Sequence, residues 1–284
     1  MRTVFVAGAF DDLHSRDVRL LEEAAGLGRV TVGLWTDDLV RAREKKPPKF
    51  PFEERLYLVQ AIRHVMGVVP FNDLPPAGPP GQRPGNGPGL RSILDGLKPQ
   101  ICVTDEKRPW PELMACCDDL GIEVRGLAPD VISSFPPPPP LAIDESSGRP
   151  RVVVTGCYDW FHSGHVRFFE EASAFGDLYV GVGSDANLRL LKGEGHPLFP
   201  QDERAYLVQS VRHVRQAFIA TGTGWMDAAP EMAVLKPRFY IVNEDGDRPE
   251  KREFCKDARI GYLVLSRTPK PGLPARDSTA LRGF

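Results

Sequence analysis

Short apolar runs alternate with helical patterns along the second half of the chain. After a strand that ends at Gly156, the pattern predicts a helix, a strand, a basic loop, a helix, a strand, a helix and a strand. With the loop omitted, their ranges are 166–175, 178–182, 202–214, 239–242, 248–258 and 262–265. Strands that alternate with helices favour a parallel sheet covered on both faces. Ligands of such sheets bind beyond the carboxyl ends of the strands.

The first half of the chain repeats this pattern. Residues 4–15 align with residues 152–163, and residues 54–65 align with residues 203–214. Internal similarity at a fixed spacing is the signature of a duplicated structural unit. The sequence therefore predicts two tandem copies of one α/β fold.

Prolines mark the predicted boundaries. The five-proline run at 136–140 favours a stiff polyproline II spacer, with an SH3-type ligand as the sharper alternative. We expect a first domain at 1–135, a Pro-rich linker at 136–150 and a second domain at 151–284. A second proline- and glycine-rich stretch, at 75–89, predicts an exposed loop in the first domain.

Composition narrows the classes of protein. A length of 284 residues suits about two domains, and 42% hydrophobic with 26% charged residues excludes general disorder. A net charge of −2 offers no electrostatic footprint for nucleic acid or an anionic membrane. Five cysteines without CxxC spacing indicate neither a disulfide framework nor a zinc ribbon. Without a signal-peptide pattern or a spanning apolar run, we expect a cytoplasmic chain.

Candidate chemistry lies where the first strand of the second copy ends. His162 and His165 are three residues apart at the start of a helix, so they lie on one face beside free backbone N–H groups. Gly164 between them removes a side chain where a ligand must approach. These features predict a phosphate site. A zinc site is the competing interpretation, but it lacks further ligands at suitable spacing, so no metal ligands are assigned.

These residues belong to a longer motif. Gly156-Cys157-Tyr158-Asp159 with His162-Ser163-Gly164-His165 resembles the GxFDxxHxGH signature of the HxGH nucleotidyltransferase superfamily, in its cytidylyltransferase-like branch. The resemblance covers residues 151–284, and weakly 1–135. It implies two tandem Rossmann-like nucleotidyltransferase domains, each a parallel sheet flanked by helices. It also implies transfer of a nucleoside monophosphate to a phosphorylated acceptor, with Mg²⁺ on the triphosphate and release of pyrophosphate.

The resemblance implies roles for particular residues. His162 and His165 would donate hydrogen bonds to phosphate oxygens. Lys192, on a glycine-containing loop, would bring a positive charge to them, or is a solvated lysine. Ser278 and Thr279 would hold the β- and γ-phosphates, or cap a last helix of little more than a turn. Further nucleotide-binding positions are Gly156, Cys157, Tyr158, Asp159, Gly164, Asp185, Arg204, Asn243, Asp245, Arg267 and Thr268.

Four of these positions have open alternatives. Arg204 contacts phosphate or pairs with a carboxylate such as Asp202 or Glu203. Asn243 and Asp245 contact the nucleotide or acceptor, or serve an ordinary turn. The role of Arg267 is open as well, because residues 269–275 separate Arg267-Thr268 from Ser278, where the family motif is nearly contiguous.

Two resemblances indicate the substrates. The tandem arrangement resembles ethanolamine-phosphate cytidylyltransferases, and the second copy alone also resembles glycerol-3-phosphate cytidylyltransferases. These resemblances predict CTP and a small phosphorylated alcohol. Ser184-Asp185-Ala186 and Leu191-Lys192-Gly193 also resemble heptose-phosphate adenylyltransferases, which leaves ATP and a sugar phosphate as the alternative. A non-catalytic nucleotide sensor is the alternative from another class.

The first copy departs from the motif. Asp17 stands where the second copy has His165, and Arg16 stands where it has Gly164. A carboxylate repels a triphosphate and an arginine side chain fills its space, so we expect an inactive pseudo-domain. The assembly is expected to be either a homodimer or an internal pseudo-dimer of the two copies.

Overall fold

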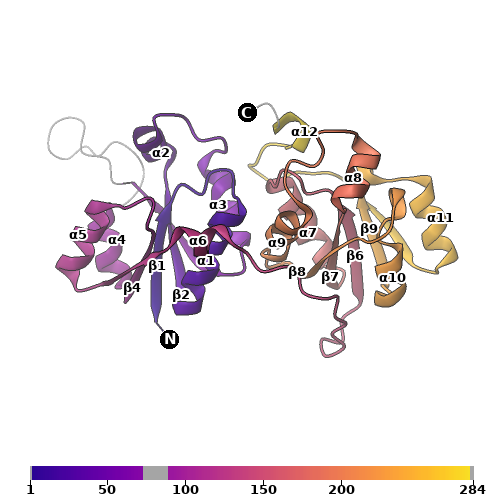
Figure 1. Ribbon diagram of the computed structural model, residues 1–284, viewed down its shortest axis with the longest axis horizontal. Helices are drawn as coiled ribbons and strands as arrows, with labels where there is room; N and C mark the ends of the chain where they lie inside the picture. The colour runs from indigo at the N-terminus through magenta and orange to yellow at the C-terminus, as the bar shows by residue number, and fades with distance from the viewer. Residues whose placement is uncertain (1, 73–88, 282–284) are drawn as a thin grey trace. The chain divides into compact units, whose positions relative to one another are not determined.

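The computed structural model describes residues 2–72 and 89–281, and for Thr279 and Ala280 only the backbone. Contacts divide the chain into two compact units, Met1–Phe135 and Pro136–Phe284, and each is described by itself (Figure 1). The loop predicted at 75–89 lies outside the described residues except for Gly89. No helix of the described residues is long and apolar enough to cross a membrane.

The first unit is a five-stranded parallel sheet with helices around it. Its strands lie in the order β3-β2-β1-β4-β5. The strands are β1 (Thr3–Gly8), β2 (Arg29–Trp35), β3 (Val65–Phe71), β4 (Ile101–Asp105) and β5 (Glu123–Leu127). The helices are α1 (Ser15–Leu27), α2 (Asp37–Glu44), α3 (Phe52–Ala61), α4 (Leu90–Leu97), α5 (Pro111–Leu120) and α6 (Pro129–Ser133).

The second unit has the same topology. Its parallel strands lie in the order β10-β9-β6-β7-β8. The strands are β6 (Arg151–Gly156), β7 (Asp177–Val182), β8 (Val214–Ile219), β9 (Phe239–Asn243) and β10 (Gly261–Leu265). The helices are α7 (Ser163–Ser173), α8 (Asp185–Lys192), α9 (Gln201–Gln209), η1 (Gly224–Met226), α10 (Ala229–Leu235), η2 (Glu244–Gly246), α11 (Pro249–Asp257) and α12 (Ser278–Leu281).

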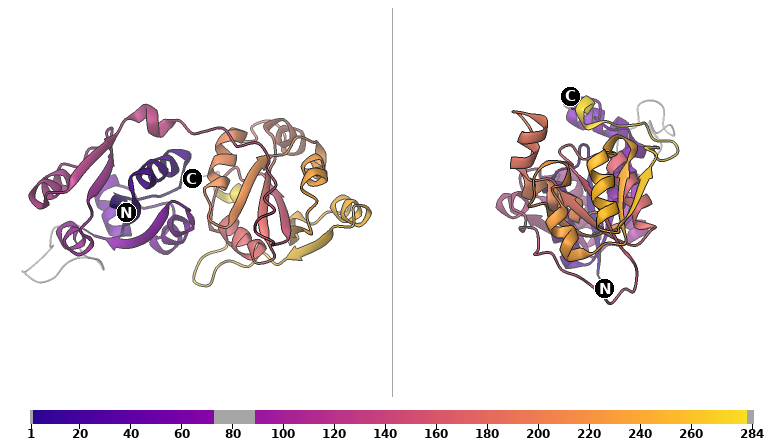
Figure 2. Two further views of the ribbon diagram at one scale, coloured as in Figure 1. Left: turned by 90° about the horizontal axis from the view of Figure 1, so that it is seen from below. Right: turned by 90° about the vertical axis from the view of Figure 1, so that its right-hand side faces the viewer.

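Counted along the chain, the strands of both sheets lie in the order 3-2-1-4-5, so the predicted Rossmann-like fold and its duplication are confirmed. The middles of the central strands are apolar because helices cover both faces of each sheet (Figure 2). Val152, Val153 and Val154 are fully buried. On one face of the second sheet, Met232 of α10 and Cys255 of α11 pack in the same core cluster as Val153.

The structure corrects the predicted elements of the second unit in three places. The helix predicted at 202–214 ends at Gln209, and the strand β8 follows it. Val208, Val211 and Val214 continue a helical spacing across this break, and that spacing concealed the strand. The structure also forms α8 where a basic loop was predicted, and α10, which was not predicted.

The proline-rich segment contacts the second unit beside β8. The Gln216 side chain donates to the carbonyls of Pro139 (3.3 Å) and Pro140 (2.8 Å) and accepts from the Ala142 N–H (2.9 Å). Leu141 packs against the core cluster of this unit. The segment therefore gives β8 hydrogen-bonding and apolar partners at the edge of the sheet.

Candidate functional site

Two histidines begin α7 at the carboxyl end of β6. His162 Nδ1 accepts from the Gly164 N–H at 3.1 Å, and His165 Nδ1 accepts from the His162 N–H at 3.4 Å. The rings stack with centroids 4.0 Å apart and planes 22° apart. Because each Nδ1 accepts, each neutral ring carries its proton on Nε2. The start of the helix thus fixes two N–H donors.

Burial keeps both imidazoles uncharged. It lowers the pKa of His162 to about 3, with a further contribution from the charge of Arg267. It holds the pKa of His165 well below its ordinary value, helped by His162, Arg267 and Lys192. His162 Nε2 is buried and has no hydrogen-bond partner among the described residues. A buried donor without an acceptor is a rare and costly feature, and a ligand oxygen would satisfy it.

Gly164 is required by the histidine beside it. A Cβ at this position would lie 2.9 Å from Cε1 and 3.0 Å from Nδ1 of His162. The sequence analysis assigned this glycine to ligand space alone. The first effect of a side chain there would be to displace the His162 ring.

The Gly-Cys-Tyr-Asp stretch holds the loop that follows α8. A Cβ on Gly156 would lie 2.7 Å from the Tyr158 ring, so this glycine admits the buried tyrosine. Asp159 Oδ1 accepts from the backbone N–H groups of Leu198 (2.7 Å) and Phe199 (3.0 Å). In the first unit, Asp11 accepts from the backbone N–H groups of residues 49 and 50 in the same way. This carboxylate therefore has a structural role in both units.

Arg204 and Asp185 form a buried clamp. The Arg204 guanidinium pairs with Asp185 Oδ1 at 2.7 Å and has no exposed surface. It also donates to three backbone carbonyls, those of Cys157, Gly183 and Phe199. This geometry agrees with the structural alternative for Arg204, although the partner is Asp185 and not Asp202 or Glu203.

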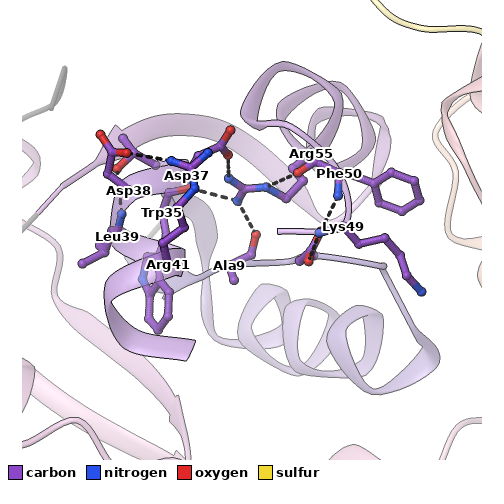
Figure 3. A network of polar contacts seen from close by, with 11 residues as sticks. Ala9, Trp35, Asp37, Asp38, Leu39, Arg41, Lys49, Phe50 and Arg55 are labelled. Carbon is purple, nitrogen blue, oxygen red and sulfur yellow. Dashed lines mark hydrogen bonds and ion pairs between the residues drawn. The ribbon is translucent and has the colours of Figure 1, made fainter. Parts of the chain in front are cut away.

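The first unit contains the same clamp. Arg55 pairs with Asp37 Oδ1 at 2.6 Å and donates to the carbonyls of Ala9, Trp35 and Phe50 (Figure 3). The clamp joins the ends of β1 and β2 to the start of α3, as its counterpart joins β6 and β7 to α9. Since it is present in the unit that lacks the paired histidines, it does not depend on them.

The C-terminal segment returns to the histidines. Arg267 donates to Asp245 at 2.6 Å and to the Arg276 carbonyl at 2.8 Å, which closes the loop at 269–275. Ser278 Oγ donates to the Trp160 carbonyl at 3.2 Å, two residues before His162. The structure thus brings Ser278 to the start of α7 despite the interrupted motif. The Thr279 side chain lies outside what the structure describes.

A cavity of about 350 Å³ lies beside this segment. Four predicted nucleotide-binding residues line it, namely Gly164, Asn243, Arg267 and Thr268. Arg167 and Arg276 also line it, and the sequence analysis did not select either. The sequence gives little indication that these two arginines lie together, because only the folded loop brings Arg276 close to α7. Two carboxylates, Glu171 and Asp277, line it as well, so three arginines give the cavity a net positive charge.

Lys192 is the last residue of α8, so the prediction that it lies on a loop is wrong. It is exposed, and Gly193 follows it with φ of +85°. The positive charge of Lys192 lowers the pKa of His165. At the Cys157 thiol, burial raises the pKa and the charge of Lys192 acts in the opposite direction. Lys192 is therefore near enough to the start of α7 to contribute positive potential there.

The equivalent positions of the first unit carry acidic groups. The helices α2 and α8 each have eight residues, and each follows a capping hydroxyl, Thr36 or Ser184. When the two helices are aligned at these caps, Glu44 is the residue equivalent to Lys192. Sequence reasoning missed this exchange, although aligning the two caps would have revealed it. Asp17 replaces His165 and accepts from the His14 N–H at 3.0 Å. The neutral donor His165 and the positively charged Lys192 thus both correspond to acidic residues in the first unit.

Comparisons with known proteins place the second unit in a family. A family model described as Cytidylyltransferase-like matches residues 153–268. The bifunctional protein HldE of a Nitratiruptor species is 46% identical over 117 residues, which make up 40% of this chain and 24% of that protein. The bifunctional protein HldE of Aliarcobacter butzleri is 43% identical over 111 residues, 39% of this chain and 22% of that protein. The matches thus span about a quarter or less of these relatives.

Among solved structures, the lipopolysaccharide core biosynthesis protein from Thermoplasma volcanium is 22% identical with a TM-score of 0.37, covering 42% of this chain and 98% of that chain. The parallel sheet defines the second unit as a Rossmann-like domain, and the paired histidines lie at its carboxyl edge. Residues 153–268 belong to the cytidylyltransferase-like family.

Proposed function

We propose that the second unit transfers a nucleoside monophosphate from a nucleoside triphosphate to a phosphorylated acceptor. An oxygen of the acceptor phosphate attacks the α-phosphorus, the bond from that phosphorus to the bridging oxygen breaks, and pyrophosphate leaves. The observation that supports this reaction best is the pair of neutral imidazoles with both Nε2–H groups as donors. Fixed donors stabilise the charge that develops on phosphate oxygens in the transition state.

The surrounding charges suit the same reaction. Arg267, Arg276 and Lys192 all act on the histidines as positive charges. The described residues contain no group of three His, Cys, Asp or Glu side chains that could hold a metal ion. In this proposal Mg²⁺ arrives with the triphosphate, whose oxygens supply its ligands, and neutralises part of its charge. Ser278 is a candidate ligand of the β- and γ-phosphates.

For the substrates, we favour ATP and a sugar phosphate over CTP and a phosphorylated alcohol. The relatives described above are HldE proteins, and the motifs around Asp185 and Lys192 resemble heptose-phosphate adenylyltransferases. The initial expectation of CTP rests on the tandem arrangement, for which these relatives offer no support. The family description alone does not decide between the two nucleotides.

Pyrophosphate release tests this proposal. The full chain is incubated with each of the four ribonucleoside triphosphates, Mg²⁺ and either a sugar phosphate or a phosphorylated alcohol. We expect release with ATP and a sugar phosphate, and a loss of roughly a hundredfold or more in His162→Ala or His165→Ala, because one fixed donor is removed. His14→Ala, the matched change in the first unit, should retain activity.

The other outcomes distinguish the alternatives. Release only with CTP and a phosphorylated alcohol would restore the initial expectation. Nucleotide binding without release from any pair would favour the sensor. Equal activity in His162→Ala and the unsubstituted protein would refute the role given to the paired donors.

A further inference from the structure

The first unit lacks the paired histidines, yet it has a cavity larger than the one beside the histidines of the second unit. The cavity measures about 770 Å³ and opens at the carboxyl ends of β1 and β4. Its wall includes the starts of α1 and α5 and the end of α2. This volume lies within the range of small-molecule sites, about 300–1,000 Å³. The unit therefore has room for a ligand at the edge of the sheet where this fold binds ligands.

The chemistry next to α1 does not suit a triphosphate. Asp17 and Glu44 line the cavity where the second unit has His165 and Lys192. Arg16, in place of Gly164, is engaged by Asp105 at 2.6 Å and by Ser133 Oγ at 2.8 Å. Two carboxylates and an occupied guanidinium leave little attraction for a chain of three phosphates on this side.

The remaining carboxylates of the wall are also engaged. Asp11 accepts two backbone N–H groups, Asp12 pairs with Lys49 Nζ at 2.6 Å, and Asp105 holds Arg16. Arg43 and Arg108 line the same cavity, and neither forms an ion pair within 4.0 Å among the described residues, although the charge of Arg108 lowers the pKa of Asp17. The cavity thus carries two guanidinium groups that lie outside the ion pairs of its wall.

Tryptophans form the wall beside these arginines. The rings of Trp35 and Trp110 meet edge to face at 5.7 Å, and the Arg43 guanidinium lies 4.3 Å from the centroid of Trp110. Trp110 is only 6% exposed. Both indole Nε1 atoms are buried without an acceptor within the described part of the chain. This side of the cavity thus combines the aromatic rings of two tryptophans with the Arg43 guanidinium.

We propose that the first unit binds a phosphomonoester in this cavity, with the phosphate at Arg43 and Arg108 and the remainder of the molecule against Trp35 and Trp110. The planar, multidentate guanidinium matches phosphate oxygens, and two such groups balance a dianion. The organic part is a nucleoside or a sugar. The first unit is then a second ligand site whose occupant differs from the triphosphate proposed for the second unit.

Calorimetric titration of the full chain tests this inference. The probes are AMP, CMP, glucose 1-phosphate and inorganic phosphate. We expect binding of at least one ester, and at least a tenfold loss of affinity in Arg108→Gln and in Arg43→Gln. Arg41→Gln is the matched control on α2, because Arg41 is exposed, pairs with Asp38 and does not line the cavity. It should bind as the unsubstituted protein does.

The assignment to the first unit is tested separately from the proposed activity. In His165→Ala, binding of the ester should persist, since that residue belongs to the second unit. A fluorescence change on ligand binding should remain when Trp160 and Trp225 are both replaced by Phe, leaving Trp35 and Trp110. Affinity unchanged in both arginine variants, loss of binding in His165→Ala, or no binding of any ester would overturn the proposal. Binding of nucleotides alone or of glucose 1-phosphate alone would identify the source of the phosphate.

Discussion

The signature motif of the second unit contains residues with two different tasks. His162 and His165 present Nε2 donors, whereas Asp159 accepts two backbone N–H groups of its own unit. The carboxylate of Asp11 does the same in the first unit, where the second histidine is replaced. Within this motif, the paired histidines therefore distinguish a unit suited to phosphate chemistry from one that shares its fold.

Neutral buried histidines make the stability of the second unit sensitive to acid. The pKa of His162 is lowered to about 3 in the folded state, so the unfolded chain binds the proton more tightly. The contribution of this imidazole to the free energy of unfolding is therefore fully present above about pH 6.5. As the pH falls below that value, the free energy of unfolding decreases by about 1.4 kcal/mol per pH unit. Urea unfolding at pH 7, 6 and 5 measures this slope.

His162→Gln serves as the comparison, since the carboxylates shared by both proteins titrate equally in each. We expect the variant to lose less stability than the unsubstituted protein between pH 7 and pH 5. Parallel pH profiles for the two proteins would contradict the lowered pKa.

The sequence predicted the local features of the site, but not the contacts between residues that are far apart along the chain. The position and spacing of the histidines are local, and the helix start they predict is present. The partner of Arg204 is not local: Asp185 lies 19 residues away, whereas Asp202 and Glu203 are its neighbours in sequence. The contact between Ser278 and the start of α7 likewise spans more than a hundred residues.

At the scale of elements, the two clamps explain why one topology persists in both units. Arg55 and Arg204 each join the ends of two strands to the helix that carries the arginine. The alternation of strands and helices was predictable because the duplicated pattern repeats it. The boundary between α9 and β8 was not, because Val208, Val211 and Val214 keep helical spacing through it.

Replacing either clamp arginine should destabilise its own unit. We expect Arg55→Met and Arg204→Met each to cost about 3 kcal/mol or more, since each leaves a carboxylate and several carbonyls without their partner. Hydrogen exchange measured by mass spectrometry should locate the loss to β1 and α3 in the first case and to β6 and α9 in the second.

Arg41→Met is the control, because Arg41 is exposed and its ion pair with Asp38 contributes little. If Arg204→Met kept full stability and lost only nucleotide binding, the phosphate contact would be the correct role for Arg204.

At the scale of the whole molecule, the chain consists of two units of one topology with different polar residues at equivalent edges. The proline-rich segment was predicted as a spacer from composition alone. Its contacts with Gln216 could not be foreseen, because a glutamine just beyond a predicted helix gives no sign of a partner more than seventy residues away. Leu141, in the same segment, adds apolar surface to the core of the second unit.

Gln216→Ala should release this segment from β8. The change removes the side-chain partner of three backbone groups and should cost about 1–3 kcal/mol. Limited proteolysis should then cut faster within residues 136–150. Gln60→Ala, at an exposed position of the first unit, should leave the rate unchanged. An unaltered cleavage rate in Gln216→Ala would show that the prolines alone hold the segment.

The duplicated clamp has a consequence for mutational tolerance. None of the residues that bind Arg55 is among those that differ chemically at the phosphate edge, namely Arg16, Asp17 and Glu44. A duplicated copy can therefore exchange its donors for carboxylates without disturbing the contacts that define its topology. The residues that hold the scaffold and the polar residues at the ligand edge are therefore separate sets, so one set can change while the other keeps the fold.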